Sequence, residues 1–160
     1  MSLFVALGSN LGDSISTLAM AFSELRKHFR PIALSRIYYS RAIGYLDQPD
    51  FYNQVAEFEL PSSHPKDVLK ILMETETKLG RIRDIKMGPR TLDLDFLFFG
   101  DQTYHDHSLD VPHPRLWTRS FVVLPLRELP GYKALSPMDN LSQALEGDAV
   151  PLENTSTLFF

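Results

Sequence analysis

The segment Leu92–Phe99, which reads LDLDFLFF, constrains the fold more than any other part of the chain, because an apolar run of this length predicts a buried β-strand. Asp93 and Asp95 interrupt that run. Residues i and i+2 of a strand share a face, so both carboxylates point the same way, about 7 Å apart at their Cα atoms. The opposite face would carry Leu92, Leu94, Phe96 and Phe98. We therefore expect the apolar face to pack on helices and the acidic face to be open to a ligand.

The spacing of apolar residues predicts a β-α-β-β-α-β order up to residue 100. Strands are expected at 3–7, 32–39, 51–60 and 92–99, and helices at 15–29 and 65–79. This order is typical of an α+β, ferredoxin-like fold, in which an antiparallel sheet has helices packed on it. Beyond it we expect a helix over 121–129 and one or two helical turns over 140–145, within a C-terminal extension.

Length and composition set further limits. A chain of 160 residues predicts one domain over 1–160, with a core at about 3–130 and an extension at 131–160. A net charge of −4 argues against general nucleic-acid binding. The absence of cysteine excludes disulfides and thiol catalysis and favours a reducing compartment. No apolar run approaches the ~20 residues that span a bilayer. We expect a cytoplasmic protein with no membrane or nucleic-acid partner.

The two aspartates have two interpretations. They can be acids on a solvated sheet face, or acids paired with Arg90, and then they need no ligand. Alternatively they hold a hard divalent cation, which removes their mutual repulsion; Mg²⁺ prefers few carboxylates together with waters and phosphate oxygens. The preceding segment, 80–90, carries three arginines and one lysine against one acid. Guanidinium groups bind phosphate oxygens bidentately, so this basic segment favours phosphoryl chemistry.

A second group of residues could bind a flat acceptor molecule. Phe51 and Asn53 share one face of the strand at 51–60 and could stack on and hydrogen-bond a heterocycle. Each could equally be an ordinary core or strand residue, and Phe121 has the same ambiguity. His113 lies between two prolines and could contact phosphate or simply order a loop. Arg119 could bind phosphate or be a surface charge.

Six motifs in this order give the chain a resemblance to a known family. They are LGSNLG (7–12), QPDFYN (48–53), LGRIR (79–83), GPRTLDLD (88–95), VPHP (111–114) and RSFVVLPL (119–126). The chain resembles the 6-hydroxymethyl-7,8-dihydropterin pyrophosphokinases of folate biosynthesis over roughly residues 3–130. The GPRTLDLD and VPHP motifs are its most specific part.

The resemblance implies transfer of diphosphate from the co-substrate ATP to the hydroxymethyl group of the pterin, with release of AMP. It implies that Asp93 and Asp95 hold two Mg²⁺ ions, and that Arg81 and Arg90 assist catalysis. The residues implied at the ATP are Glu76, Arg83, Phe96, His113 and Arg119. The residues implied at the pterin are Ser40, Ile43, Phe51, Asn53 and Phe121. Single-domain members of the family lead us to expect a monomer whose partners are small molecules.

The chain departs from the family pattern at two methionines. Met87 stands where many members carry an aromatic residue, and Met73 stands where many carry glutamine. A catalytically weakened relative is therefore one alternative. A ferredoxin-like module that binds a nucleotide or RNA without chemistry is another, although an acid pair repels phosphate unless a metal is bound.

Overall fold

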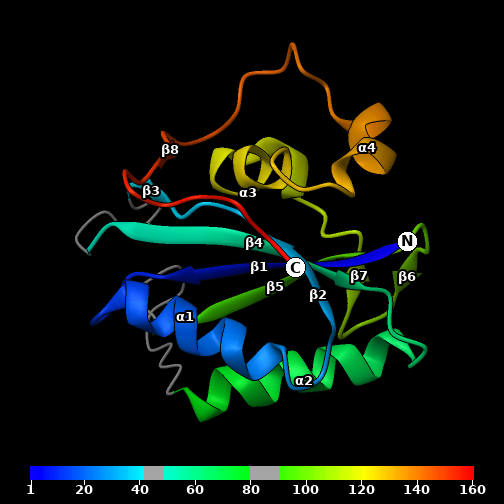
Figure 1. Ribbon diagram of the computed structural model, residues 1–160. Coiled ribbons are helices and arrows are strands. Elements are labelled where there is room, and N and C mark those ends of the chain that lie inside the picture. The colour runs from blue at the N-terminus through cyan, green and yellow to red at the C-terminus, as the bar shows by residue number, and fades with distance from the viewer. Residues whose placement is uncertain (42–48, 80–90) are drawn as a thin grey trace.

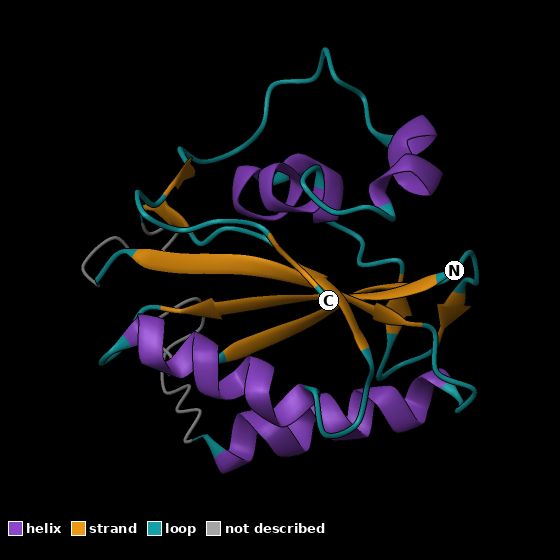
Figure 2. Ribbon diagram, viewed as in Figure 1, coloured by secondary structure: helices purple, strands orange, loops and turns teal. Residues whose placement is uncertain are grey.

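The chain folds into an α+β structure built on one large antiparallel sheet. The computed structural model describes residues 1–41, 49–79 and 91–160 (Figures 1 and 2). The strands of the large sheet are β1 (Ser2–Ser9), β2 (Pro31–Leu34), β3 (Tyr38–Ser40), β4 (Phe51–Glu59), β5 (Asp93–Phe99), β8 (Val150–Pro151) and β9 (Leu158–Phe159). Their order is β5-β1-β4-β2-β9, with β3 also paired to β4 and β8 paired to β3. Strands β6 (Tyr104–His105) and β7 (Asp110–Val111) form a separate two-stranded sheet.

Helices cover both faces of the large sheet. In Figure 1, α1 (Ser14–Leu25) and α2 (Pro65–Lys78) lie on one face and α3 (Ser120–Leu126) lies on the other. The remaining helical elements of the described chain are the 3₁₀ turns η1 (Leu116–Thr118) and η2 (Ser136–Met138) and the short α4 (Tyr132–Leu135). Each face has its own apolar core: Phe58 and Leu72 belong to the first, Val55 and Leu126 to the second. The expectation of one open sheet face is therefore wrong, because α3 covers part of it.

Residues 51–60 form β4 as predicted, with the expected alternation. Val55 packs on the α3 side, whereas Ala56 and Phe58 pack on the α1 and α2 side. In β5 the prediction is only partly right. Phe96 pairs with Val5 and Phe98 pairs with Phe4, so Leu97 is an extra residue in the strand.

Because of this irregularity, Phe98 lies on the face of the sheet opposite to the predicted one. Leu92, Leu94 and Phe96 lie in the α1 and α2 core as predicted, but Phe98 lies in the α3 core. A bulge shifts the alternation by one residue, which is why the prediction for Phe98 is wrong.

The single strand predicted at 32–39 is two strands, β2 and β3. Leu34 pairs with Ala56 and Tyr38 with Asn53, so one extra residue interrupts the register between them. At the interruption the Ser35 hydroxyl accepts a hydrogen bond from the Val55 backbone N–H at 2.9 Å. The serine side chain thus satisfies a backbone N–H that would otherwise bond to the neighbouring strand.

The first two helices begin where the sequence predicts. Asp13 caps α1 by accepting from the Ser16 N–H at 3.2 Å. His64 caps α2, and Pro65 occupies the first helical position, where its missing N–H costs nothing. Ile15 was expected on the buried stripe of α1, but its side chain is 48% exposed, so that expectation is wrong.

The C-terminal extension returns to the sheet. Strand β8 pairs with β3 and β9 pairs with β2, so both strands extend the sheet beyond β2 and β3 (Figure 1). Residues 140–145 form turns and not the predicted helical turns. Over the described ranges 1–41, 49–79 and 91–160, no helix is both long and apolar enough to cross a membrane.

Candidate active site

The predicted acid pair lies on β5, at the edge of the large sheet. Asp93 pairs with Gly8 and Asp95 with Ala6, and Ala6 belongs to the α3 core, so both carboxylates are on the α3 side. Both residues are half-buried. In the described part of the chain no cluster of three or more acidic or histidine side chains has metal-ligand geometry. A cation held by this pair would therefore take its other ligands from water and phosphate, which is the donor set that Mg²⁺ prefers.

Helix α2 supports the strand that carries the pair. The buried Glu76 carboxylate on α2 accepts a hydrogen bond from the Leu94 backbone N–H at 2.8 Å. Leu94 lies between the two aspartates, and β5 ends the sheet order, so no strand of the described residues pairs with its outer side. The sequence placed Glu76 at the ATP site. The structure also gives it a contact that fixes the backbone between Asp93 and Asp95.

A row of paired residues connects the acid pair to the predicted acceptor site. Asp93 on β5 pairs with Gly8 on β1, and Gly8 pairs with Asn53 on β4. Two strand spacings separate Asp93 from Asn53, about 10 Å. A Cβ atom on Gly8 would lie 2.6 Å from Asn53 Oδ1, closer than any ordinary contact. The absence of a side chain on Gly8 thus makes room for the Asn53 amide, which lies over the glycine on the side of the acids.

Asn53 has an unsatisfied donor. The residue is 9% exposed, and its Nδ2 atom is buried with no hydrogen-bond partner among the described residues. Buried polar groups are nearly always bonded, and an exception in a folded protein calls for an explanation. A bound molecule that presents an acceptor above Gly8 would supply the missing partner.

Two aromatic residues flank this position. Phe51 precedes Asn53 by two residues on the same face of β4, is half-buried and pairs with the buried Ser40 of β3. Phe121, on α3, is also half-buried and packs against the α3 core. The Arg119 guanidinium lies 5.7 Å from the centre of the Phe121 ring.

His113 lies in the same neighbourhood. Its backbone N–H donates to the Leu97 carbonyl at 3.1 Å, and its Nδ1 accepts from the Arg115 N–H at 3.3 Å. Burial lowers the pKa of His113, the charge of Arg119 lowers it further, and the charge of Asp93 opposes both. The imidazole therefore stays neutral at neutral pH and shares an electrostatic environment with Arg119 and Asp93.

The remaining predicted residues are placed differently. Phe96 is 5% exposed and packs in the α1 and α2 core against Phe99. Four predicted residues lie outside the described part of the chain: Ile43, Arg81, Arg83 and Arg90. Their roles stay predictions. Met73 lies on the surface of α2, 57% exposed, beside a shallow hollow that Leu69 and Lys70 also line.

Two further residues of the site were not singled out from the sequence. Gly8 is one, for the reason given above. The other is Asn10, which is 2% exposed and donates from Nδ2 to the Pro49 carbonyl at 2.9 Å, just before β4 begins. The signal was present, since both lie in the LGSNLG motif immediately after a predicted strand. Their function depends on a partner strand more than 40 residues away, which the motif does not identify.

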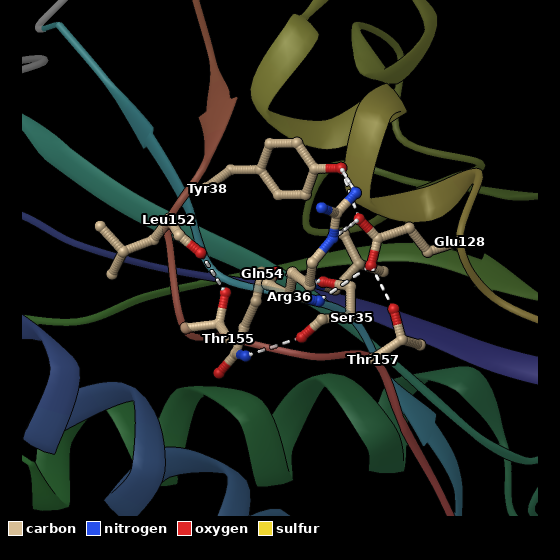
Figure 3. Close-up of polar contacts among 9 residues, drawn as sticks. Ser35, Arg36, Tyr38, Gln54, Glu128, Leu152, Thr155 and Thr157 are labelled. Atoms are coloured by element: carbon tan, nitrogen blue, oxygen red, sulfur yellow. Dashed lines mark hydrogen bonds and ion pairs between the residues drawn. The ribbon is translucent and has the colours of Figure 1, made fainter.

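A polar network fixes β3 against the end of α3. The Glu128 carboxylate accepts from the Arg36 backbone N–H and Nε, both at 3.0 Å, and from the Tyr38 hydroxyl and the Thr157 hydroxyl (Figure 3). Burial and the contact with Glu128 raise the pKa of Tyr38 to about 12. Tyr38 pairs with Asn53 across the sheet, so this network supports the acceptor side of the site.

The geometry defines a class of protein before any comparison. An acid pair at a sheet edge and, across a glycine, a buried amide with an unsatisfied donor among the described residues suit metal-dependent group transfer to a flat, polar acceptor. A model of the family described as 7,8-dihydro-6-hydroxymethylpterin-pyrophosphokinase matches residues 4–131. The chain belongs to this family, whose members transfer diphosphate from ATP to hydroxymethyldihydropterin in folate biosynthesis.

Individual relatives agree. The 2-amino-4-hydroxy-6-hydroxymethyldihydropteridine pyrophosphokinase of Bacillus subtilis is 39% identical over 128 residues, which cover 79% of this chain and 76% of the relative. The Pseudomonas aeruginosa protein of the same name is 41% identical over 128 residues, 79% of this chain and 78% of the relative. The folic acid synthesis protein fol1 of Pneumocystis carinii is 38% identical over 144 residues. Those residues are 89% of this chain but only 19% of that longer protein.

Proposed function

We propose that the sheet surface between Asp93 and Asn53 is where this chain carries out its family's reaction. The reaction transfers diphosphate from ATP to the hydroxymethyl oxygen of 6-hydroxymethyl-7,8-dihydropterin. That oxygen attacks the β-phosphorus, the bond from this phosphorus to the oxygen bridging to the α-phosphate breaks, and AMP leaves. The observation that carries the proposal is the row Asp93–Gly8–Asn53, which sets an acid pair and an amide with an unsatisfied donor about 10 Å apart on one face of the sheet.

On the acceptor side, Phe51 and Phe121 hold the pterin ring between them. Asn53 Nδ2 donates to an acceptor on the edge of the ring, which satisfies its missing hydrogen bond. The resemblance to the family also assigns Ser40 and Ile43 to the pterin. Stacking and the amide contact orient the hydroxymethyl group toward the acid pair, and correct orientation is a large part of the rate of such transfers.

On the donor side, Asp93 and Asp95 would hold two Mg²⁺ ions, which would shield phosphate charge and lower the pKa of the acceptor hydroxyl. His113, Arg119 and Arg83 serve the ATP directly, and Glu76 and Phe96 support the ATP side from beneath β5, where both are buried. A neutral His113 donates to a phosphate oxygen without adding charge. Arg81 and Arg90 neutralise the charge that develops as AMP leaves.

We further propose that residues 1–160 form one ferredoxin-like domain with an extension at 131–160. The sheet order β5-β1-β4-β2 and the alternation of helices with strands support this fold. We propose a monomer in the cytoplasm. All described site residues come from one chain, and the absence of cysteine suits a reducing compartment.

The test is AMP formation from ATP and the pterin, with Mg²⁺ and with EDTA. We expect AMP that requires both Mg²⁺ and the pterin. Asp95→Asn should lower the rate at least about 100-fold, because transition-state charge stabilisation is lost, while the fold stays intact. Asp101→Asn, on the exposed turn after β5, is the matched control and should keep full activity. A nearly normal rate in Asp95→Asn would contradict the assignment of the acid pair.

A further inference from the structure

The segment 146–152 lies outside the residues that the family model matches, yet it connects two parts of the proposed pterin site. We call this segment the C-terminal clasp. It runs from the start of α3 to β3 and includes β8, which Figure 1 shows alongside β3. The residues that the clasp contacts at each end lie next in sequence to residues proposed to bind the pterin.

At one end the clasp bonds the start of α3. The Ser120 N–H donates to the Glu146 carbonyl at 2.9 Å, and the Glu146 N–H donates to the Thr118 carbonyl at 2.7 Å. The Ala149 N–H donates to the Ser120 Oγ at 3.2 Å, and both residues are buried. These bonds fix the backbone on both sides of Arg119 and immediately before Phe121.

At the other end the clasp bonds β3. Val150 and Pro151 pair with Tyr39 and Tyr38, and the Leu152 N–H donates to the Ile37 carbonyl at 2.7 Å. Figure 3 shows Leu152 beside Tyr38. The Asp148 carboxylate accepts from the Arg41 backbone N–H at 3.0 Å and from its Nε at 2.6 Å. These contacts fix the chain immediately after Ser40.

We propose that the C-terminal clasp is a positioning element for the pterin: it sets the separation between Phe121 on α3 and the Ser40 end of β3. This inference rests on the proposed function of the site. A stacking site tolerates little error in the distance between its walls, and small misplacements from supporting residues lower binding and rate strongly. A separate contact, the hydrogen bond from the Tyr38 hydroxyl to Glu128, links β3 to the chain just beyond the far end of α3.

The ion pair between Asp148 of the clasp and Arg41 allows positioning of the pterin to be tested apart from general stability. The side chains of Arg41 and Asp148 are 77% and 43% exposed, and exposed pairs contribute little to folding. Asp148→Ala should therefore fold normally while freeing the chain after Ser40. The double variant Asp148→Ala/Ala149→Pro also removes the N–H that bonds Ser120.

The same extension offers a matched control. Asp139 is 1% exposed as a side chain and accepts from Arg127 Nε at 2.8 Å, beyond the far end of α3, and from the Tyr132 hydroxyl of α4 at 2.7 Å. Asp139→Ala removes an aspartate–arginine pair of the same chemistry and should cost more stability than Asp148→Ala. It does not touch the residues beside Phe121 or Ser40.

The experiment measures the dissociation constants of 6-hydroxymethyl-7,8-dihydropterin and of a non-hydrolysable ATP analogue with Mg²⁺, together with thermal unfolding, in all four proteins. We expect Asp148→Ala to raise the dissociation constant of the pterin about three- to tenfold, and the double variant to raise it further. A tenfold change corresponds to ~1.4 kcal/mol of binding free energy. The constant for the ATP analogue should change less than about twofold, and Asp139→Ala should unfold at a lower temperature while binding the pterin normally.

Two results would contradict the proposed role of the clasp. One is a dissociation constant for the pterin within about twofold of normal in the double variant, with an unchanged affinity for the ATP analogue. The other is an equal loss of affinity for both ligands, which indicates general loosening of the protein. Failure of the unaltered protein to bind the pterin at all is a different outcome. It overturns the proposed function, and the clasp with it.

Discussion

At the scale of single residues, Gly8 determines how much room the acceptor site has. It lies between Asp93 and Asn53 in the sheet and is the residue over which the proposed pterin and phosphates meet. A methyl group on it would lie 2.6 Å from Asn53 Oδ1, and Asn53 is too buried to move aside freely. Any larger residue here changes the position of the amide.

We expect Gly8→Ala to lower the free energy of unfolding by about 1–3 kcal/mol through overpacking. It should also weaken pterin binding about tenfold, because the displaced amide no longer meets the ring edge. Urea denaturation and a binding titration measure the two effects. Gly12→Ala is an unsuitable control because Gly12 has φ 74°, where any side chain is strained.

The clash itself can be tested by a double-mutant cycle with Asn53→Ala. If Gly8→Ala acts by pushing the amide, removing the amide should restore part of the lost stability, and the two changes should not be additive. Additive stability losses would show that the alanine methyl group meets something other than Asn53.

The residue scale also shows what the sequence could predict. Period-two alternation correctly placed Phe51 with Asn53 and Asp93 with Asp95, because the faces of a strand depend only on local spacing. Gly8 was not recognised as part of the site, and the bond from Glu76 to Leu94 was not foreseen. Both depend on strand pairing and helix packing between residues distant in sequence, and alternation carries no information about either.

At the scale of elements, α2 and β5 act together through Glu76. The carboxylate satisfies the outward N–H of Leu94, on the side of β5 where the described part of the chain has no further strand. This bond holds the backbone between the two aspartates, and so the helix sets the direction in which they point.

We expect Glu76→Ala to lower stability by about 1–3 kcal/mol, because it leaves a buried N–H unpaired. It should also raise the Mg²⁺ concentration needed for half-maximal AMP formation. Glu76→Gln keeps an acceptor oxygen and is the matched comparison, with smaller changes in both quantities. If Glu76→Ala raises only the KM for ATP and leaves stability and Mg²⁺ dependence unchanged, Glu76 acts on ATP and not on the acid pair.

Where the elements differ from prediction, the cause is again a contact that local patterns do not encode. The predicted strand at 32–39 divides because the Ser35 hydroxyl takes the place of a backbone group beside Val55. Phe98 changes face because Leu97 is an extra residue opposite β1. A serine or a leucine inside an apolar run gives no sign of either event in the sequence.

At the scale of the whole molecule, Glu128 joins three parts of the chain. Its carboxylate bonds the β2–β3 junction at Arg36, the core tyrosine Tyr38 and the C-terminal segment at Thr157 (Figure 3). The extension was predicted only as an appendage, yet through these bonds and β9 it closes the edge of the sheet. The α+β class and the antiparallel sheet could be predicted from the sequence, but this closure could not, since β8 and β9 are two residues each.

The protonation of Glu128 should therefore control how the whole protein responds to acid. Burial acts to raise the pKa of Glu128, but the bonds from Thr157, Tyr38 and Arg36 outweigh it, and the pKa is lowered from 4.5. A carboxyl group with a lowered pKa stabilises the fold above its unfolded pKa. This stabilisation is lost as the pH falls through the folded pKa, because the unfolded chain then binds more protons.

We expect Glu128→Gln to be less stable than the unaltered protein by about 1–3 kcal/mol at pH 7, because the charged partner of Arg36 is gone. Glutamine resembles a protonated glutamate, so the difference should shrink as the pH falls below about 4.5 toward the folded pKa. Urea denaturation of both proteins across this range measures it. Glu153→Gln, at an exposed position of the same extension, should leave stability and its pH dependence unchanged. If the stability difference stays constant with pH, the negative charge of Glu128 does not hold the three parts together. The size and packing of its side chain would then do so.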